Sequence, residues 1–173
     1  MQRLTELYTA KINAKYIESL GGFEIGKEHY IFIVLLHTSF LISLLSESFY
    51  RDPPHFWYLP FMLFVLLQIF RIWTILSLGK FWNTRIYILP YSKPVKKGPY
   101  KYIRHPNYLV VMLEMLIIPF IFGAYITLLV FPLINFWLLN KRIHVEEKAM
   151  NDHTAYQLEM ENKPRFIPRL KKY

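Results

Sequence analysis

The sequence predicts an all-α, polytopic membrane protein with about four transmembrane helices. The 173 residues are 54% hydrophobic, and mean hydropathy is +0.21 although the chain carries 21 Lys and Arg. Three long apolar runs cover residues 29–50, 55–78 and 108–140. A membrane-spanning helix needs about 20 residues, so the third run is long enough for two helices. The basic residues gather between and beside these runs rather than within them.

Residues 2–20 predict an amphipathic helix that lies on the membrane interface. Their apolar side chains recur at helical spacing, which is typical of such helices. The glycine-rich segment "LGGFEIG" then ends the helix, so residues 1–28 form the expected interfacial segment. The apolar positions are Leu4, Leu7, Tyr8, Ile12, Tyr16 and Leu20.

The apolar runs predict the transmembrane helices in order. Residues 29–78 contain helices one and two, and residues 108–140 are expected to form a helical hairpin. Gly123 in "FGAY" suits a tight turn between legs at 108–122 and 125–140. A soluble bundle with buried helices is the alternative for such runs, and the placement of the charges argues against it.

The basic residues predict the orientation of these helices. With four spans, the N-terminus, the loop 79–107 and the tail 141–173 share one side, and they hold every Lys and Arg except Arg51 and Arg71. The positive-inside rule places that side in the cytoplasm of a cell-membrane protein. Topology therefore accounts for the net charge of +9 and removes the need for a nucleic-acid partner. With no Cys in the chain, disulfides and thiolate chemistry are excluded.

Two opposite charges lie inside the apolar runs, Arg71 and Glu114. Residue counting places both about 10–12 Å from the cytoplasmic ends of their helices. Intramembrane charges mark functional-site candidates, so the pair is either a structural ion pair or the lining of a polar pocket in which Arg71 binds an anionic group. Gln68 and, less strongly, Asn135 are candidates for the same pocket. Glu47, near the outer end of its helix, is expected to meet water.

The loop 79–107 is the expected ligand-binding loop. Its residues 79–105 combine three Pro and four Tyr with seven basic residues, so its turns are fixed and its charge is positive. It is suited either to an anionic, nucleotide-like ligand or to a collar of lipid headgroups.

The cytoplasmic tail, residues 141–173, begins with "KRIHVEEKAM" and is expected to start as a helix. Arg142 and Glu146 lie four apart, which predicts a solvated extension with i,i+4 pairs. The alternative is that Glu146 and Glu147 accept hydrogen bonds from ribose hydroxyls or an amino group beside the basic loop.

One combination of motifs resembles a known family. The segment "GPYKYIRHPNY", a helical hairpin and then "EE" resemble the isoprenylcysteine carboxyl methyltransferase family of integral membrane enzymes, which use S-adenosylmethionine without a Rossmann domain. The upstream "RIWTILSLGKFWNTRI" is similar as well. "GGFEIGKEHYIFIVLLH" resembles a bacterial branch associated with O-methylation of polyketide lipids such as alkylpyrones. Bacterial members often carry a further apolar helix before the segment that resembles "QRLTEL".

The resemblance implies an activity and a set of site residues. It implies methyl transfer from S-adenosylmethionine to an oxygen, in a carboxylate or an acidic hydroxyl, of a lipidic, isoprenoid or polyketide acceptor that enters from the bilayer. It also implies that Arg71 and Glu114 line the acceptor site near the transferred methyl group. The implied cofactor residues are Gly98, Pro99, Tyr100, Arg104, His105, Pro106, Tyr108, Glu146 and Glu147.

Three other functions remain open at this stage. Phospholipid N-methyltransferases share the cofactor and the size, and NADPH-dependent sterol reductases carry a similar R-H-P-N-Y segment. A non-catalytic lipid-binding protein would need Arg71 and Glu114 only as a structural pair. The scattered His residues predict no metal site.

Overall fold

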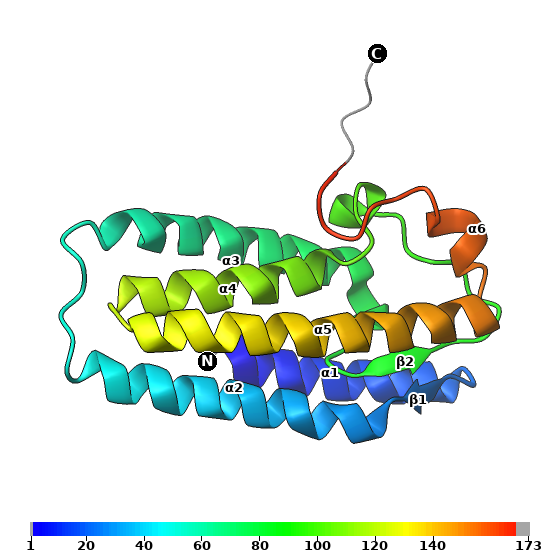
Figure 1. Ribbon diagram of the computed structural model, residues 1–173. Coiled ribbons are helices and arrows are strands. Elements are labelled where there is room, and N and C mark those ends of the chain that lie inside the picture. The colour runs from blue at the N-terminus through cyan, green and yellow to red at the C-terminus, as the bar shows by residue number, and fades with distance from the viewer. Residues whose placement is uncertain (1, 169–173) are drawn as a thin grey trace, which may run out of the picture. The chain divides into compact units, whose positions relative to one another are not determined.

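The computed structural model describes residues 2–168 and is almost entirely helical (Figure 1). This confirms the predicted all-α class. The described residues hold one small sheet, in which β1 (Phe23–Ile25) pairs antiparallel with β2 (Ile86–Ile88). Two 3₁₀ helices, η1 and η2, cover Gly79–Phe81 and Gly98–Lys101. The α-helices are α1 (Gln2–Ser19), α2 (Lys27–Ser48), α3 (Tyr58–Leu78), α4 (Pro106–Ile121), α5 (Tyr125–His153) and α6 (Tyr156–Met160).

Within residues 2–168, three helical segments are long and apolar enough to cross a membrane, which supports a multi-pass membrane protein. They cover Tyr30–Ser48, Tyr58–Phe81 and Tyr125–His153. The remaining apolar helix, α4, has 16 residues and extends about 24 Å, less than the roughly 30 Å of a bilayer core. Residues 2–168 therefore hold three full-length candidates and one shorter apolar helix, α4, which lies where the first leg of the hairpin was predicted at 108–122.

The chain divides into two compact units. The first contains Met1–Glu28, Trp73–Pro106 and Arg142–Tyr173, as far as these are described, and the second contains His29–Ile72 and Asn107–Lys141. Residues 79–106 of the predicted loop fall in the first unit and are structured, since they include η1, β2 and η2. The first part of the predicted tail is helical, as expected, and it continues α5 without a break.

In the first unit, α1 packs through a face that its apolar pattern did not indicate. Glu6, Ala10, Asn13 and Ile17 are its buried residues. The Asn13 side chain donates hydrogen bonds to the carbonyl oxygens of Gly79 and Trp82, at 3.1 and 2.7 Å. The six apolar positions of the predicted face are exposed or half-buried, so they remain available for the predicted membrane interface.

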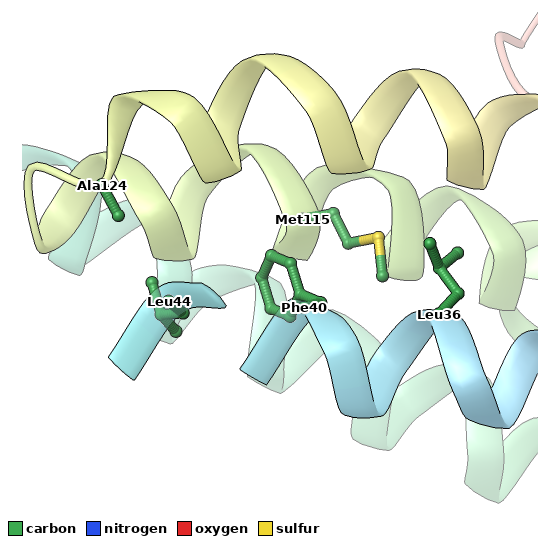
Figure 2. Close-up of a cluster of buried hydrophobic side chains, with 5 residues drawn as sticks. All are labelled: Leu36, Phe40, Leu44, Met115 and Ala124. Carbon is green, nitrogen blue, oxygen red and sulfur yellow. The ribbon is translucent and has the colours of Figure 1, made fainter. Parts of the chain in front are cut away.

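In the second unit, α2, α3, α4 and the first part of α5 run beside one another (Figure 1). Their core is a cluster to which α2 contributes three side chains, opposite Met115 of α4 and Ala124 of the turn (Figure 2). Gly123 makes the predicted tight turn with φ of +69°, and a Cβ there would lie 2.6 Å from the Asp52 carbonyl oxygen. The α2 residues of the cluster are Leu36, Phe40 and Leu44.

Glu47 does not simply meet water, as its place near the end of α2 suggested. Its carboxylate accepts hydrogen bonds from the backbone N–H groups of Ile126 and Thr127, at 2.9 and 3.0 Å, and from the Thr127 hydroxyl at 3.0 Å. The first N–H groups of a helix have no partner within the helix. Glu47 therefore caps the start of α5 and joins it to α2.

Candidate functional site

Arg71 and Glu114 meet in the second unit, as residue counting predicted. The Arg71 Nη1 atom lies 2.8 Å from each carboxylate oxygen of Glu114. The Gln68 Nε2 atom donates to Glu114 Oε1 at 2.9 Å. The side chains of Arg71 and Glu114 are 3% and 6% exposed, so α3 and α4 hold a nearly dry ion pair.

The burial of this pair determines how it responds to change. Removing one partner from a buried ion pair leaves an uncompensated charge, which typically costs about 3–5 kcal/mol. Replacing both partners by apolar residues is often neutral or stabilising. The contact of Arg71 with Glu114 is thus compatible with a structural role and with an acceptor site. Replacing both residues should abolish catalysis if the pair lines an acceptor site and should leave catalysis intact if its role is structural.

A second charged cluster lies in the first unit, around Glu147 of α5. Oε1 of Glu147 lies 3.0 Å from His105 Nε2 and 3.1 Å from Arg104 Nη1. Arg165 grips the same carboxylate with two nitrogens, Nε at 3.1 Å from Oε1 and Nη2 at 2.6 Å from Oε2. Three basic side chains therefore surround one carboxylate, and a fork of this kind is a strong, directional contact.

The environment of Glu147 keeps its carboxylate ionised. Glu147 lies 22 residues after the start of α5, about 33 Å along the helix and past the apolar part that can cross a bilayer. Burial by itself would raise the pKa of Glu147, but the hydrogen bonds from His105 and Arg165 outweigh it and lower the pKa to about 2. The cluster therefore combines a permanent negative charge with a surplus of positive charge.

One polar atom in this cluster is buried without a bond. Arg104 Nε has no hydrogen-bond partner within residues 2–168. An unbonded guanidinium N–H next to surplus positive charge suits an anionic ligand group, because carboxylates bind guanidinium groups in a bidentate way. The residues present therefore fit a ligand that carries a carboxylate, as S-adenosylmethionine does.

Local backbone features shape the loop that carries Arg104 and His105. Gly98 has φ of +52°, a conformation that glycine adopts without strain. A Cβ there would overlap the Ser77 side chain and approach Trp73 Nε1 to 2.9 Å. Pro99 is the second residue of η2 and Pro106 is the first residue of α4, and in a first turn the missing N–H of proline costs nothing.

The other predicted cofactor residues are placed as follows. Pro99, Tyr100, His105 and Pro106 are buried, and Glu146 is half-buried beside Glu147. Tyr108 follows in the first turn of α4 and belongs to the second unit.

Arg142 differs from its prediction as a solvated partner of Glu146. It is 8% exposed, and its Nη2 donates to the backbone carbonyl of Thr84 at 2.6 Å. Arg142 thus connects α5 to the segment before β2 within the first unit, because its long side chain reaches the Thr84 carbonyl outside its own helix.

Arg165 and the short segment around it were not predicted from the sequence. Lys163, Pro164 and Arg165, which we call the 163–165 strap, run beside the loop that precedes α4 (Figure 1, red). Lys163 Nζ donates to the Tyr100 carbonyl at 2.8 Å. The backbone N–H groups of Arg104 and His105 donate to the carbonyls of Pro164 and Arg165, at 3.0 and 3.1 Å.

A signal for the strap is present in "KPRFIPR". A proline disfavours helix for the residue before it, so this segment reads as extended backbone with free carbonyl groups. The sequence does not indicate that those carbonyl groups accept hydrogen bonds from the loop before α4.

Groups of three or more His, Asp or Glu placed to hold a metal ion do not occur in the described part of the chain.

Comparison with known proteins identifies the family. Residues 59–152 match the model of the isoprenylcysteine carboxyl methyltransferase family. The chain belongs to the isoprenylcysteine carboxyl methyltransferase family. It is 40% identical to the uncharacterized protein YpbQ of Bacillus subtilis (strain 168), over 90% of this chain and 94% of that protein.

A second relative comes from Haemophilus influenzae, an uncharacterized protein that is 26% identical over 83% of this chain and 87% of its own length. Membership in the isoprenylcysteine carboxyl methyltransferase family, together with three membrane-spanning candidates, supports a membrane methyltransferase.

The strap gives a prediction that needs no substrate. Arg165→Met removes both contacts with Glu147 and should loosen the 163–165 strap, because a hydrogen bond to a charged group contributes about 1.5–3 kcal/mol. Hydrogen exchange measured by mass spectrometry should then be at least about ten-fold faster at the amides of Arg104 and His105, since 1.4 kcal/mol is a factor of ten.

An internal control is the Tyr91 amide, which bonds the His153 carbonyl in the same unit and should keep its exchange rate. Unchanged exchange at Arg104 and His105 in the Arg165→Met variant would show that the strap is held by other contacts.

Proposed function

We propose that the protein transfers a methyl group from S-adenosylmethionine to an oxygen of a lipidic acceptor, in a carboxylate or an acidic hydroxyl on an isoprenoid or polyketide chain. The observation that carries the proposal is the family match over residues 59–152, which includes both Arg71 with Glu114 and Glu147 with its partners Arg104 and His105. Membrane-embedded helices suit an acceptor that is delivered by the bilayer.

The first unit is the proposed cofactor-binding part. Its surplus of positive charge around Glu147 suits the carboxylate of S-adenosylmethionine, and the Glu147 carboxylate suits an ammonium or hydroxyl donor. Arg165 joins this set on the basis of its contacts. The set proposed from the family resemblance is Gly98, Pro99, Tyr100, Arg104, His105, Pro106, Glu146 and Glu147, with Tyr108 at the start of α4.

The second unit is the proposed acceptor-binding part. When bound, S-adenosylmethionine supplies an electrophilic methyl group on a sulfonium, and transfer depends mainly on the position of the nucleophile. Arg71 would hold the acceptor oxygen as an anion, which is the nucleophilic form. Glu114 fixes the Arg71 guanidinium from one side, and it would take the proton when the acceptor is a hydroxyl.

We also propose that the termini and the loop 79–107 face the cytoplasm. Both the basic loop and the basic tail lie on that side in the positive-inside orientation. S-adenosylmethionine is a water-soluble donor and would reach Glu147 from that side, whereas a lipid would reach Arg71 laterally.

Ligand binding tests the proposal against its rivals. Purified protein in detergent should bind S-adenosylmethionine and should not bind NADPH, as measured by isothermal titration calorimetry. Binding of NADPH alone would favour a reductase, and binding of neither ligand by folded protein would contradict the proposal. A methylated ethanolamine phospholipid as product would favour the N-methyltransferase instead.

A further inference from the structure

Asn135 of α5 is a buried polar residue whose amide is not fully bonded. The residue is 2% exposed, and its side-chain Nδ2 has no hydrogen-bond partner within residues 2–168. It lies in the second unit, whose helices cross the membrane. The bilayer core contains no water that could accept a hydrogen bond from this donor, so the amide needs another partner.

The neighbours of Asn135 show that it points into the second unit. Phe131 and Leu138, one turn before and one turn after it, pack against the core cluster of Figure 2. Leu133 and Phe136, on the other side of α5, are 73% and 55% exposed. Asn135 is therefore not on the exposed face of α5, and its amide points toward the neighbouring helices of the second unit.

The level of Asn135 along the hairpin is close to that of the buried ion pair. Glu114 lies nine residues before Gly123 and Asn135 twelve residues after it. In an antiparallel hairpin these positions differ by three residues, or about 4.5 Å along the helix axes. The second unit thus holds the Arg71–Glu114 pair and an unbonded amide donor within about one helical turn in depth.

Keeping a donor unbonded in this place has a cost. A buried hydrogen-bonding group without a partner destabilises a fold by about 1–3 kcal/mol, and a leucine of similar volume would avoid that penalty. Buried polar groups without partners are rare and call for an explanation such as a ligand. The chemistry that satisfies an amide N–H is an oxygen lone pair on the ligand.

We propose that Asn135 is a further acceptor-binding residue, whose Nδ2 donates a hydrogen bond to an oxygen of the lipidic acceptor. This inference rests on the proposed function and sharpens it, because it makes an oxygen on the ligand a requirement. A site built to bond a polar group rejects analogues that lack it far more strongly than an apolar site does. Asn135 binds and orients the acceptor and transfers no proton.

The test is the Asn135→Leu variant, examined in maltoside detergent with palmitate as an oxygen-bearing probe and hexadecane as its apolar match. Without a ligand, Asn135→Leu should raise the Tm, because the unbonded donor is gone. Wild-type protein should be stabilised more by palmitate than by hexadecane. In Asn135→Leu, the apparent Kd for palmitate should increase at least about ten-fold, and the preference for palmitate over hexadecane should shrink by the same factor, because only Arg71 is then left to hold the carboxylate.

Thr127→Val is the matched control on the same face of α5. Its hydroxyl bonds Glu47 and contacts Ser43, so this variant should lower the Tm and keep the response to palmitate. A lower Tm for Asn135→Leu would overturn the inference, since the amide would then have a protein partner. An unchanged preference for palmitate in that variant, or no preference in the wild type, would overturn it as well.

The two proposals fail in different ways. Palmitate binding that depends on Asn135, without any methyl transfer, would leave the Asn135 site standing and remove the proposed activity. Methyl transfer at the wild-type kcat/KM in Asn135→Leu would keep the activity and remove the role of Asn135.

Discussion

Single replacements of Arg71 or Glu114 by leucine should abolish methyl transfer and destabilise the protein, whereas the double replacement should restore stability but not transfer. The pair is 2.8 Å apart and nearly dry. Each single variant leaves one buried charge, which costs about 3–5 kcal/mol, whereas removing both leaves none. Catalysis depends on a guanidinium that holds the acceptor oxygen, and the double variant lacks it.

A double-mutant cycle makes this prediction measurable. Thermal unfolding and S-adenosylmethionine binding are recorded for the wild type, Arg71→Leu, Glu114→Leu and the double variant. The double variant should unfold near the wild-type Tm and should bind S-adenosylmethionine normally, while its turnover falls to background. Thr127→Val, a buried polar change in the same unit outside the proposed site, controls for a general loss of packing.

The result that would contradict the acceptor-site assignment is near-normal turnover in the stable double variant. Arg71 and Glu114 would then be a structural ion pair between α3 and α4, which is the alternative that the sequence left open.

Glu147→Gln should weaken S-adenosylmethionine binding by about ten-fold or more, and this is the second large effect. The amide cannot accept the forked hydrogen bonds of Arg165 as a carboxylate does, and it leaves the basic groups around it uncompensated. A hydrogen bond to a charged group contributes about 1.5–3 kcal/mol, so the loss of one such bond should raise the Kd for S-adenosylmethionine by roughly one order of magnitude or more. Equilibrium binding by calorimetry measures it directly.

The matched control for Glu147→Gln is Glu24→Gln. Glu24 is also a well-buried, ion-paired carboxylate of the first unit, with Arg85 at 2.9 Å. This control should keep the cofactor affinity even if it loses some stability. Equal losses of affinity in Glu24→Gln and Glu147→Gln would mean that the effect comes from the fold of the unit and not from the cofactor site.

The sequence predicted the features that depend on helix geometry. Arg71 and Glu114 sit at equal depth because the rise per residue is fixed, so counting from the loop between them was enough to predict that they meet. Gly123 made its predicted turn for a local reason, since glycine adopts a positive φ without strain, whereas the close approach of the Asp52 carbonyl could not be predicted from the sequence.

Features that depend on pairing between distant segments were not predictable in the same way. Arg165 reaches Glu147 from the segment that follows α6, and no periodic pattern in the sequence connects the two residues. Glu47 looked like a residue at a helix end, yet its partners are backbone N–H groups 79 and 80 residues further along the chain.

The buried face of α1 could not be predicted from its apolar pattern, because a contact with a distant segment determines it. The apolar positions predicted the face of α1 that is expected to lie on the membrane interface. The opposite, packed face includes Asn13, which is buried because its amide donates hydrogen bonds to the carbonyl oxygens of Gly79 and Trp82. The short sheet escaped notice for a similar reason, as three-residue strands carry too little alternation to indicate a partner.

The proposed O-methylation of a lipid is tested most directly by an assay of methyl transfer. Purified wild-type protein and the Arg71→Leu/Glu114→Leu double variant are incubated with methyl-labelled S-adenosylmethionine and a lipid extract, and the labelled product is identified by mass spectrometry. We expect label on an oxygen of a lipid, as an ester or an ether, with the wild type and none with the double variant. Absence of label from folded wild-type protein that binds the cofactor, or label on a phospholipid amine, would contradict it.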